Sequence, residues 1–290
     1  MLEAVPNVSE GREQGAIRAI GTAFAAGVEL LDVHSDADHH RSVFTLAGAD
    51  DRLVESLLAG TARALELVDL RRHDGVHPRV GVVDVAPFVP LEPGDMEVAK
   101  AAALELAARI GGELEVPVFL YGEVGDGRRP AFYRRGGSDE LARRVASGEL
   151  EPAAGPTRID PRSGAVLVGA RSVLVAYNVE LRTQDVDAAR SIAAAVRESS
   201  GGMPGVQAIG LRLLRAGRVQ VSMNVVDLER SALHEVVERV RREAAARGIE
   251  LAGGEVVGLV PARVLDEAAA AGVRIPGVDE TRVLERALRL

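Results

Sequence analysis

The chain has 290 residues, of which 47% are hydrophobic and 27% charged, and this length allows one large or two ordinary domains. The 35 Lys and Arg against 43 Asp and Glu give a net charge of −8, which disfavours nucleic-acid partners; the lack of Cys excludes disulfides, Fe–S clusters and thiol nucleophiles. Neither a run of about 20 apolar residues nor a signal-peptide pattern occurs, so we expect a cytoplasmic protein with no membrane partner.

The first part of the chain alternates between strand and helix patterns. Apolar runs and polar–apolar alternation predict strands at residues 2–5, 28–33, 42–46 and 80–85, and apolar residues at helical spacing predict helices over 17–24 and 53–68. We expect the strand at 28–33 to be buried. The predicted order is βαββαβ, and a helix at 99–110 and a strand at 116–121 follow it.

Residues 122–164 are rich in Gly and Pro and contain one short helical candidate at 139–147. A loop-rich segment of this length is usually functional or a linker. It is locally basic, with Arg128, Arg129, Arg134, Arg135, Arg143 and Arg144. Guanidinium groups bind carboxylates with two hydrogen bonds, so the segment suits a small polyanion. The alternative is solvated loop charge, offset by nearby acidic residues.

The last part of the chain repeats the first pattern. Strands are predicted at 165–168, 173–178, 206–214, 218–225 and 255–260, and helices over 185–197, 233–244, 261–270 and 281–288. The stretch from 173 onward is therefore βαββαβ again, with two further helices at its end.

Two copies of this pattern predict an α+β protein of two ferredoxin-like subdomains, residues 1–171 and 172–290. Each has an antiparallel or mixed sheet with helices on one face. The alternative is one doubly wound sheet. We prefer two subdomains because the strands at 28–33 and 42–46 have no helix between them, and a parallel crossover requires one.

Five of the six histidines fall in two clusters, HSDADHHR at 34–41 and HDGVHPR at 73–79. His77 precedes Pro78 in a loop that leads into the strand at 80–85, so the sheet positions it. Histidine takes and returns protons at neutral pH, because its unperturbed pKa is about 6.5. This favours His77 as a general acid/base, and the alternative is an ordinary polar loop.

The first cluster has a second interpretation. Together with Asp36 and Asp38, the histidines His34, His39 and His40 are possible ligands of a divalent metal. A metal-dependent hydrolase or phosphoesterase is therefore the alternative function. The structural alternative is a polar hairpin loop whose side chains bind main-chain N–H groups.

Several blocks together resemble glutamate formimidoyltransferase, in the stand-alone microbial form without a cyclodeaminase domain. These blocks are VPNVSEG at 5–11, LLDVHSDADHHRSVFTLAG at 30–48, HDGVHPRVGVVDVAPFVP at 73–90, VPVFLYGE at 116–123, GPTRIDPRSGAVLVGARSVLVAYNVEL at 155–181, VSMNVVD at 221–227 and EVVGLVPARVL at 255–265. The resemblance is colinear and covers nearly the whole chain. Two departures occur, Val76 where the family commonly has Glu and His40 where it commonly has Asn.

The resemblance implies transfer of the formimino group from N-formimidoyl-L-glutamate to N5 of tetrahydrofolate, a step of histidine degradation. It implies two ferredoxin-like subdomains that meet at the site, and His77 as the catalytic acid/base. The family's folate-binding segment falls on Gly155, Pro156, Thr157, Arg158, Ile159, Asp160, Pro161, Arg162, Ser163 and Gly164.

The charges of the remaining candidates suggest their roles. Asp36, Asp38 or Asp84 suit the cationic formimino group, and Arg41 and Arg79 suit substrate carboxylates. The amidinium is already electrophilic, so we expect tetrahydrofolate as co-substrate and no metal. The expected partners are these small molecules and, in a homodimer, a second copy of the chain.

Overall fold

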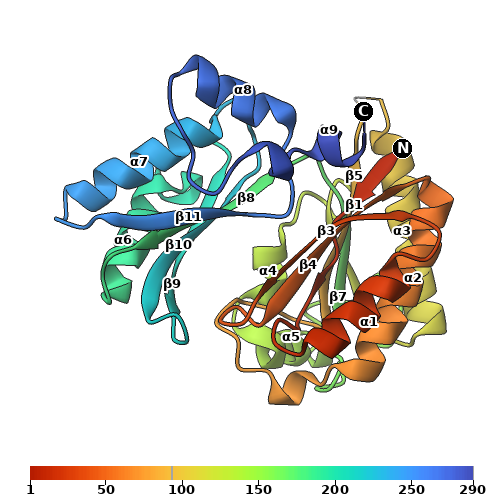
Figure 1. Ribbon diagram of the computed structural model, residues 1–290. Coiled ribbons are helices and arrows are strands. Elements are labelled where there is room, and N and C mark those ends of the chain that lie inside the picture. Colours follow the sequence, from red (N-terminus) through yellow and green to blue (C-terminus); the bar gives the residue numbers. More distant parts are fainter. Residues whose placement is uncertain (93, 290) are drawn as a thin grey trace. The chain divides into compact units, whose positions relative to one another are not determined.

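The computed structural model describes residues 1–92 and 94–289, and it divides into two compact units, Met1–Ser172 and Val173–Leu290. Figure 1 shows a separate sheet in each unit. The predicted α+β class is confirmed, with one mixed and one antiparallel sheet. Among the described residues, no helix is long and apolar enough to cross a membrane.

The sheet of the first unit contains seven strands within the described residues. They are β1 (Leu2–Ala4), β2 (Asn7–Val8), β3 (Glu29–Asp36), β4 (Arg41–Gly48), β5 (Val83–Pro90), β6 (Val118–Gly122) and β7 (Val166–Ala170). β1 and β2 both lie between β4 and β5, so they form one interrupted strand. β3 pairs antiparallel with β4, and β7 and β6 extend the sheet beyond β5 in parallel. The βαββαβ unit is thus enlarged by two parallel strands.

Helices cover both faces of this sheet. α1 (Gln14–Phe24), α2 (Asp50–Leu67) and α3 (Met96–Glu113) enclose the main core on one face. On the other face, α4 (Pro130–Arg134) and α5 (Gly137–Ala146) contribute Tyr133 and Leu141 to a smaller core with Phe119 of β6. The Gly-rich middle of the chain therefore folds into a second helical layer, visible in Figure 1.

The second unit has the predicted βαββαβ order. Its elements are β8 (Val175–Leu181), α6 (Val186–Val196), β9 (Val206–Leu213), β10 (Arg218–Val225), α7 (Leu233–Ala245) and β11 (Leu251–Val257). The strands pair antiparallel in the order β11-β8-β10-β9. Apolar side chains from α6 and α7 pack on one face of the sheet, and α8 (Ala262–Ala270) and α9 (Leu284–Ala287) end the unit.

Two strand predictions differ from the structure. The strand expected to be buried at 28–33 is β3, an edge strand whose Val33 is 39% exposed, because an apolar run does not say how many neighbours a strand has. The strand expected at 80–85 begins at Val83. Before it, Gly81 lies so close to the main chain of Ala165 that a Cβ atom would stand 1.9 Å from that carbonyl oxygen.

Candidate functional site

His77 lies in the loop between the 3₁₀ turn Leu70–Arg72 and β5, and its side chain is half-buried. Its Nδ1 atom is 2.8 Å from the carbonyl oxygen of Pro78. A carbonyl oxygen only accepts, so Nδ1 carries the proton and donates it. The neutral ring therefore presents its lone pair at Nε2, the atom that would act as a base.

The loop that carries His77 is held by its own side chains. The Arg79 guanidinium donates to the carbonyl oxygens of His73 (2.7 Å) and Gly75 (3.0 Å). His73 donates from Nε2 to the carbonyl oxygen of His40 (2.7 Å), and its Nδ1 accepts from the N–H of Gly75 (3.2 Å). Burial lowers the pKa of His73 to about 4, which agrees with this neutral ring. The loop is thereby tied to the β3–β4 turn.

The structure brings together the two histidine clusters that are separate in the sequence. The rings of His40 and His73 stack with centroids 4.2 Å apart, and those of His39 and His77 are tilted with centroids 5.8 Å apart. A main-chain hydrogen bond of 3.0 Å from Val76 to Asp38 also joins the two segments. His34 lies on β3, outside both ring pairs.

Glu10 fixes the β3–β4 turn against the start of α1. Its Oε1 atom accepts from the main-chain N–H groups of Arg12 (2.7 Å) and Glu13 (3.0 Å) and lies 3.2 Å from Nε2 of His40. Burial by itself raises the pKa of Glu10, but these donors lower it to about 2. Glu10 is therefore ionised at neutral pH, and its charge holds His40 in place.

Asp84 of β5 is fully buried and binds two arginines. Its Oδ2 accepts from Arg41 (2.8 Å) and Arg134 (2.5 Å), while its Oδ1 accepts from the main-chain N–H of Val80 (2.8 Å). Burial alone raises the pKa of Asp84, but the charges of Arg134 and Arg41 outweigh it and lower the pKa far below its usual value. One carboxylate thus neutralises only one of the two guanidinium groups that it binds.

These charges act on His77. Burial lowers its pKa well below the usual value, and the positive charges of Arg41 and Arg134 lower it further, while the negative charge of Asp84 opposes them. His77 is therefore neutral at physiological pH. A neutral ring with a lone pair at Nε2 is the form that a general base needs.

A cavity of about 370 Å³ opens beside His77. It is lined by Gly75, Val76, His77, Pro78, Arg79, Arg134, Gly137 and Ser138. All of these residues belong to the first unit, and Gly137 and Ser138 begin α5. A proton-accepting ring next to two guanidinium groups suits the anionic end of a small molecule.

The remaining candidates from the first cluster lie in the β3–β4 turn or at the strand ends beside it. Asp36 accepts from the main-chain N–H of His39 (2.6 Å), and Asp38 is 8% exposed. Arg41 donates to Asn7 (3.0 Å) as well as to Asp84. Within residues 1–92 and 94–289, no group of three or more His, Asp and Glu side chains is arranged to hold a metal ion.

The segment from Gly155 to Gly164 runs alongside the start of β5. Leu70 donates to the carbonyl oxygen of Arg162 (3.0 Å), and Val82 donates to that of Ser163 (2.9 Å). None of its residues lines the cavity next to His77. The structure thus holds the segment against residues on either side of the His77 loop, and its exposed side chains do not line the cavity.

The roles of two residues of the site, Arg134 and Glu10, were not predicted from the sequence. Arg134 appeared only as one member of a basic run, and Glu10 only as part of a resembling block. Nothing in the local sequence separates Arg134 from its neighbour Arg135, which is exposed. For Glu10, the signal was its place before the first helix, where a carboxylate can accept main-chain N–H groups.

The neutral state of His73 predicts an acid-side loss of stability. Between pH 6.5 and about 4 the unfolded chain binds a proton at this position that the folded chain does not, so the free energy of unfolding falls as the pH falls. His73→Gln should reduce this slope by at most about 1.4 kcal/mol per pH unit, measured by urea denaturation. His234→Gln, which removes a histidine far from this loop in the sequence, is the control, and the slope measured for it is compared with that of His73→Gln. An unchanged slope in His73→Gln would contradict a neutral His73.

Comparisons with known proteins match both units. The model of the formiminotransferase domain, N-terminal subdomain, matches residues 1–171, and that of the formiminotransferase domain matches residues 176–275. The chain is 36% identical to glutamate formimidoyltransferase of Thermoplasma acidophilum over 99% of this chain and 96% of that protein. It is 37% identical to the Streptococcus pyogenes enzyme of the same name, over 99% and 98%. It is also 40% identical to formimidoyltransferase-cyclodeaminase of Sus scrofa, over 93% of this chain and 52% of that protein.

Proposed function

Because this chain belongs to the formiminotransferase family, we propose that it transfers the formimino group of N-formimidoyl-L-glutamate to N5 of tetrahydrofolate. The observation that carries the proposal is the neutral His77 ring, which lines the same cavity as Arg79 and Arg134. Its Nδ1 donates to the carbonyl oxygen of Pro78, so its Nε2 is left as the base. The family match does not favour the metal-dependent hydrolase suggested by the first histidine cluster.

In the proposed reaction, the lone pair of N5 attacks the amidinium carbon and forms a tetrahedral intermediate. His77 accepts at Nε2 the proton that N5 loses. It then donates this proton to the glutamate nitrogen as the bond between that nitrogen and the amidinium carbon breaks. The products are 5-formimidoyltetrahydrofolate and L-glutamate, and His77 is neutral again. A single group that performs both transfers typically contributes about 10²- to 10⁴-fold in rate.

The carboxylates near the site have different proposed roles, because their existing hydrogen bonds differ. Both oxygens of Asp84 are already bound by protein donors, so its proposed role is to hold Arg41 and Arg134 in place. Asp36 at the end of β3 and Asp38 in the turn that follows are the candidates for contact with the cationic formimino group.

We assign folate binding to the segment from Gly155 to Gly164, which accepts main-chain hydrogen bonds from Leu70 and Val82 on either side of the His77 loop. Arg158 is exposed in this segment and suits a glutamate carboxylate of the folate tail. Arg158→Ala should raise KM for tetrahydrofolate about 3- to 10-fold, as expected for one exposed charged contact, and should leave kcat unchanged. The rise should be larger for polyglutamylated folate. Equal KM values for both folates in the variant and the parent would place the tail elsewhere.

The direct test is to incubate the purified protein with N-formimidoyl-L-glutamate and tetrahydrofolate and to measure both products. Formation of L-glutamate and 5-formimidoyltetrahydrofolate in equal amounts supports the proposal. Folate binding without transfer would instead identify a folate-binding paralogue. Val76, where the family commonly has Glu, is the reason to test for one. The proposed cytoplasmic location and homodimer are checked by cell fractionation and light scattering.

A further inference from the structure

Three arginines lie around His77 and Asp84, and they differ in how their guanidinium groups are used. Arg41 is buried, donates to Asn7 and Asp84, and does not line the cavity. Arg79 lines the cavity, but its two terminal nitrogens donate to carbonyl oxygens of its own loop. Both arginines therefore hold the protein framework.

Arg134 is different. It lines the cavity together with His77, it donates from Nη2 to Asp84, and its side chain is 16% exposed. Its Nε atom is buried and has no hydrogen-bond partner among the described residues. An unmade hydrogen bond on a buried charged group is costly, so the protein itself satisfies the Arg134 guanidinium only in part.

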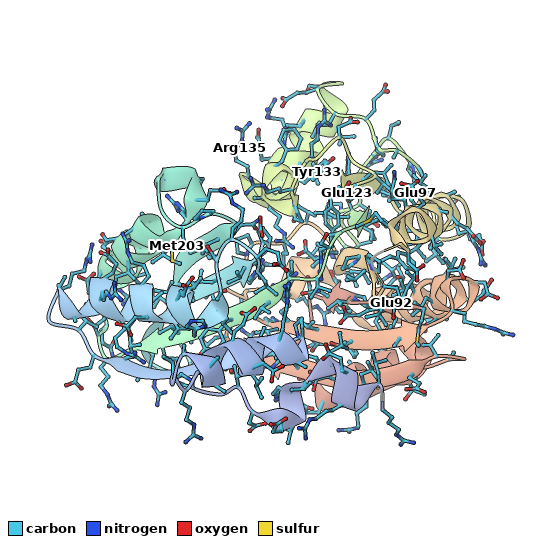
Figure 2. All side chains as sticks on the ribbon, turned by 90° about the horizontal axis from the view of Figure 1, so that it is seen from above. Glu92, Glu97, Glu123, Tyr133, Arg135 and Met203 are labelled. Carbon is cyan, nitrogen blue, oxygen red and sulfur yellow. The ribbon has the colours of Figure 1, made fainter. Side chains whose placement is uncertain are left out.

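The position of Arg134 is set by its neighbour. Tyr133, labelled in Figure 2, is 2% exposed and donates its hydroxyl to the carbonyl oxygen of Leu120 on β6 (2.7 Å). Its ring packs on Phe119 with centroids 5.2 Å apart. The short helix α4 is thus anchored to the sheet, and the Arg134 guanidinium is held on Asp84 before any ligand arrives.

The charge balance indicates an anionic ligand. Asp84 carries one negative charge against the two positive charges of Arg41 and Arg134, and Arg79 adds a third positive charge at the cavity wall. In the donor proposed above, a single carbon separates the α-carboxylate from the nitrogen that leaves. A carboxylate bound at Arg134 would therefore bring the leaving nitrogen into the cavity that His77 lines.

We infer that Arg134 binds the α-carboxylate of the formimino donor and so selects N-formimidoyl amino acids over simple formimidoyl amines. This inference rests on the proposed function and deepens it. A charge-assisted hydrogen bond in a buried site corresponds to roughly a 10- to 100-fold preference.

The test compares two donors, N-formimidoyl-L-glutamate and N-formimidoyl-4-aminobutyrate, which lacks only the α-carboxylate. The parent protein should prefer the first in kcat/KM by about 10- to 100-fold. Arg134→Ala should remove this preference, because its kcat/KM should fall about 10- to 100-fold further with the first donor than with the second. Arg134→Lys should recover part of the preference, because it restores the charge without the planar fork.

The matched control is Arg135→Ala, which removes the adjacent exposed arginine outside the cavity; this residue is labelled in Figure 2. It should keep the parental preference. Thermal melting checks that each variant is folded, and Arg134→Gln replaces the alanine variant if that one unfolds. An equal loss with both donors in a folded Arg134 variant would overturn the inference and indicate a structural role.

A second measurement separates this inference from the proposed function. If the parent protein transfers nothing, calorimetry compares its binding of N-acetyl-L-glutamate and N-acetyl-4-aminobutyrate. A preference for the first ligand that disappears in the Arg134 variant supports carboxylate binding by Arg134 even though the reaction is another one. Equal binding of the two ligands by the parent protein would overturn the inference.

Discussion

Replacing His77 with Gln lowers kcat for formimino transfer by about 10²- to 10⁴-fold and leaves the melting temperature close to that of the parent protein. The loss follows because Gln keeps a similar shape but does not accept and return a proton. The fold is spared because His77 is half-buried in a loop whose main chain is held by Arg79 and His73. Steady-state kinetics and calorimetric melting measure the two effects.

The pH profile gives the same residue a second signature. The base form of His77 is needed, and burial with the charges of Arg41 and Arg134 lowers its pKa well below 6.5. Transfer by the parent protein should therefore persist below pH 6.5, where an unperturbed histidine would already be half protonated. A His77→Gln variant that retains more than about a tenth of the parental kcat would contradict acid/base catalysis by this residue.

Replacing Asp84 with Ala has the largest effect expected on stability, a loss of about 3–5 kcal/mol in the free energy of unfolding. The carboxylate is fully buried, and its removal leaves Arg41 and Arg134 close together without their shared counter-charge. The main-chain N–H of Val80 also loses its acceptor. Chemical denaturation measures the loss, and transfer activity should fall as well because Arg134 is no longer held.

Two comparisons make this result specific. Glu97 of α3, labelled in Figure 2, pairs with Lys100 on the surface, and Glu97→Ala should change the free energy of unfolding by less than about 0.5 kcal/mol. Asp84→Asn keeps the volume and removes the charge, so it should also be strongly destabilising. A loss below about 1 kcal/mol in Asp84→Ala would show that the two arginines find other partners.

The contribution of Asp84 also depends on pH in a defined direction. Its pKa is lowered in the folded state, so its stabilisation is fully present above the unfolded value of 3.8. The stabilisation is lost as the pH falls below that value, because the unfolded chain then binds the proton first. The Asp84→Asn variant should lack this part of the acid-side loss.

The elements of this protein were largely predictable from the sequence, because their patterns are local. Apolar residues at helical spacing follow from burial of one helix face, as in α2, and alternation in strands follows from the two faces of a sheet. The βαββαβ order of the second unit could therefore be predicted from the sequence. The edge position of β3 was not, since an apolar run has the same composition whether one neighbour or two lie beside it.

A short motif in the sequence was enough to propose the catalytic chemistry. His77 stands before Pro78 in a loop that enters a strand, and this context already indicated a positioned acid/base. The family resemblance rested on blocks spread over the chain, and the comparisons confirm that membership.

The sequence by itself thus determined the α+β class, the family and the candidate base, since each rests on short local patterns and on their order along the chain. Only the tertiary structure decided that His40 stacks on His73, and that Asp84 holds Arg134 rather than the adjacent Arg135. These pairs are 33 and 50 residues apart in the chain. Their contacts depend on how strands and helices pack, and packing brings Arg134 onto Asp84 while it leaves the chemically identical Arg135 exposed to water.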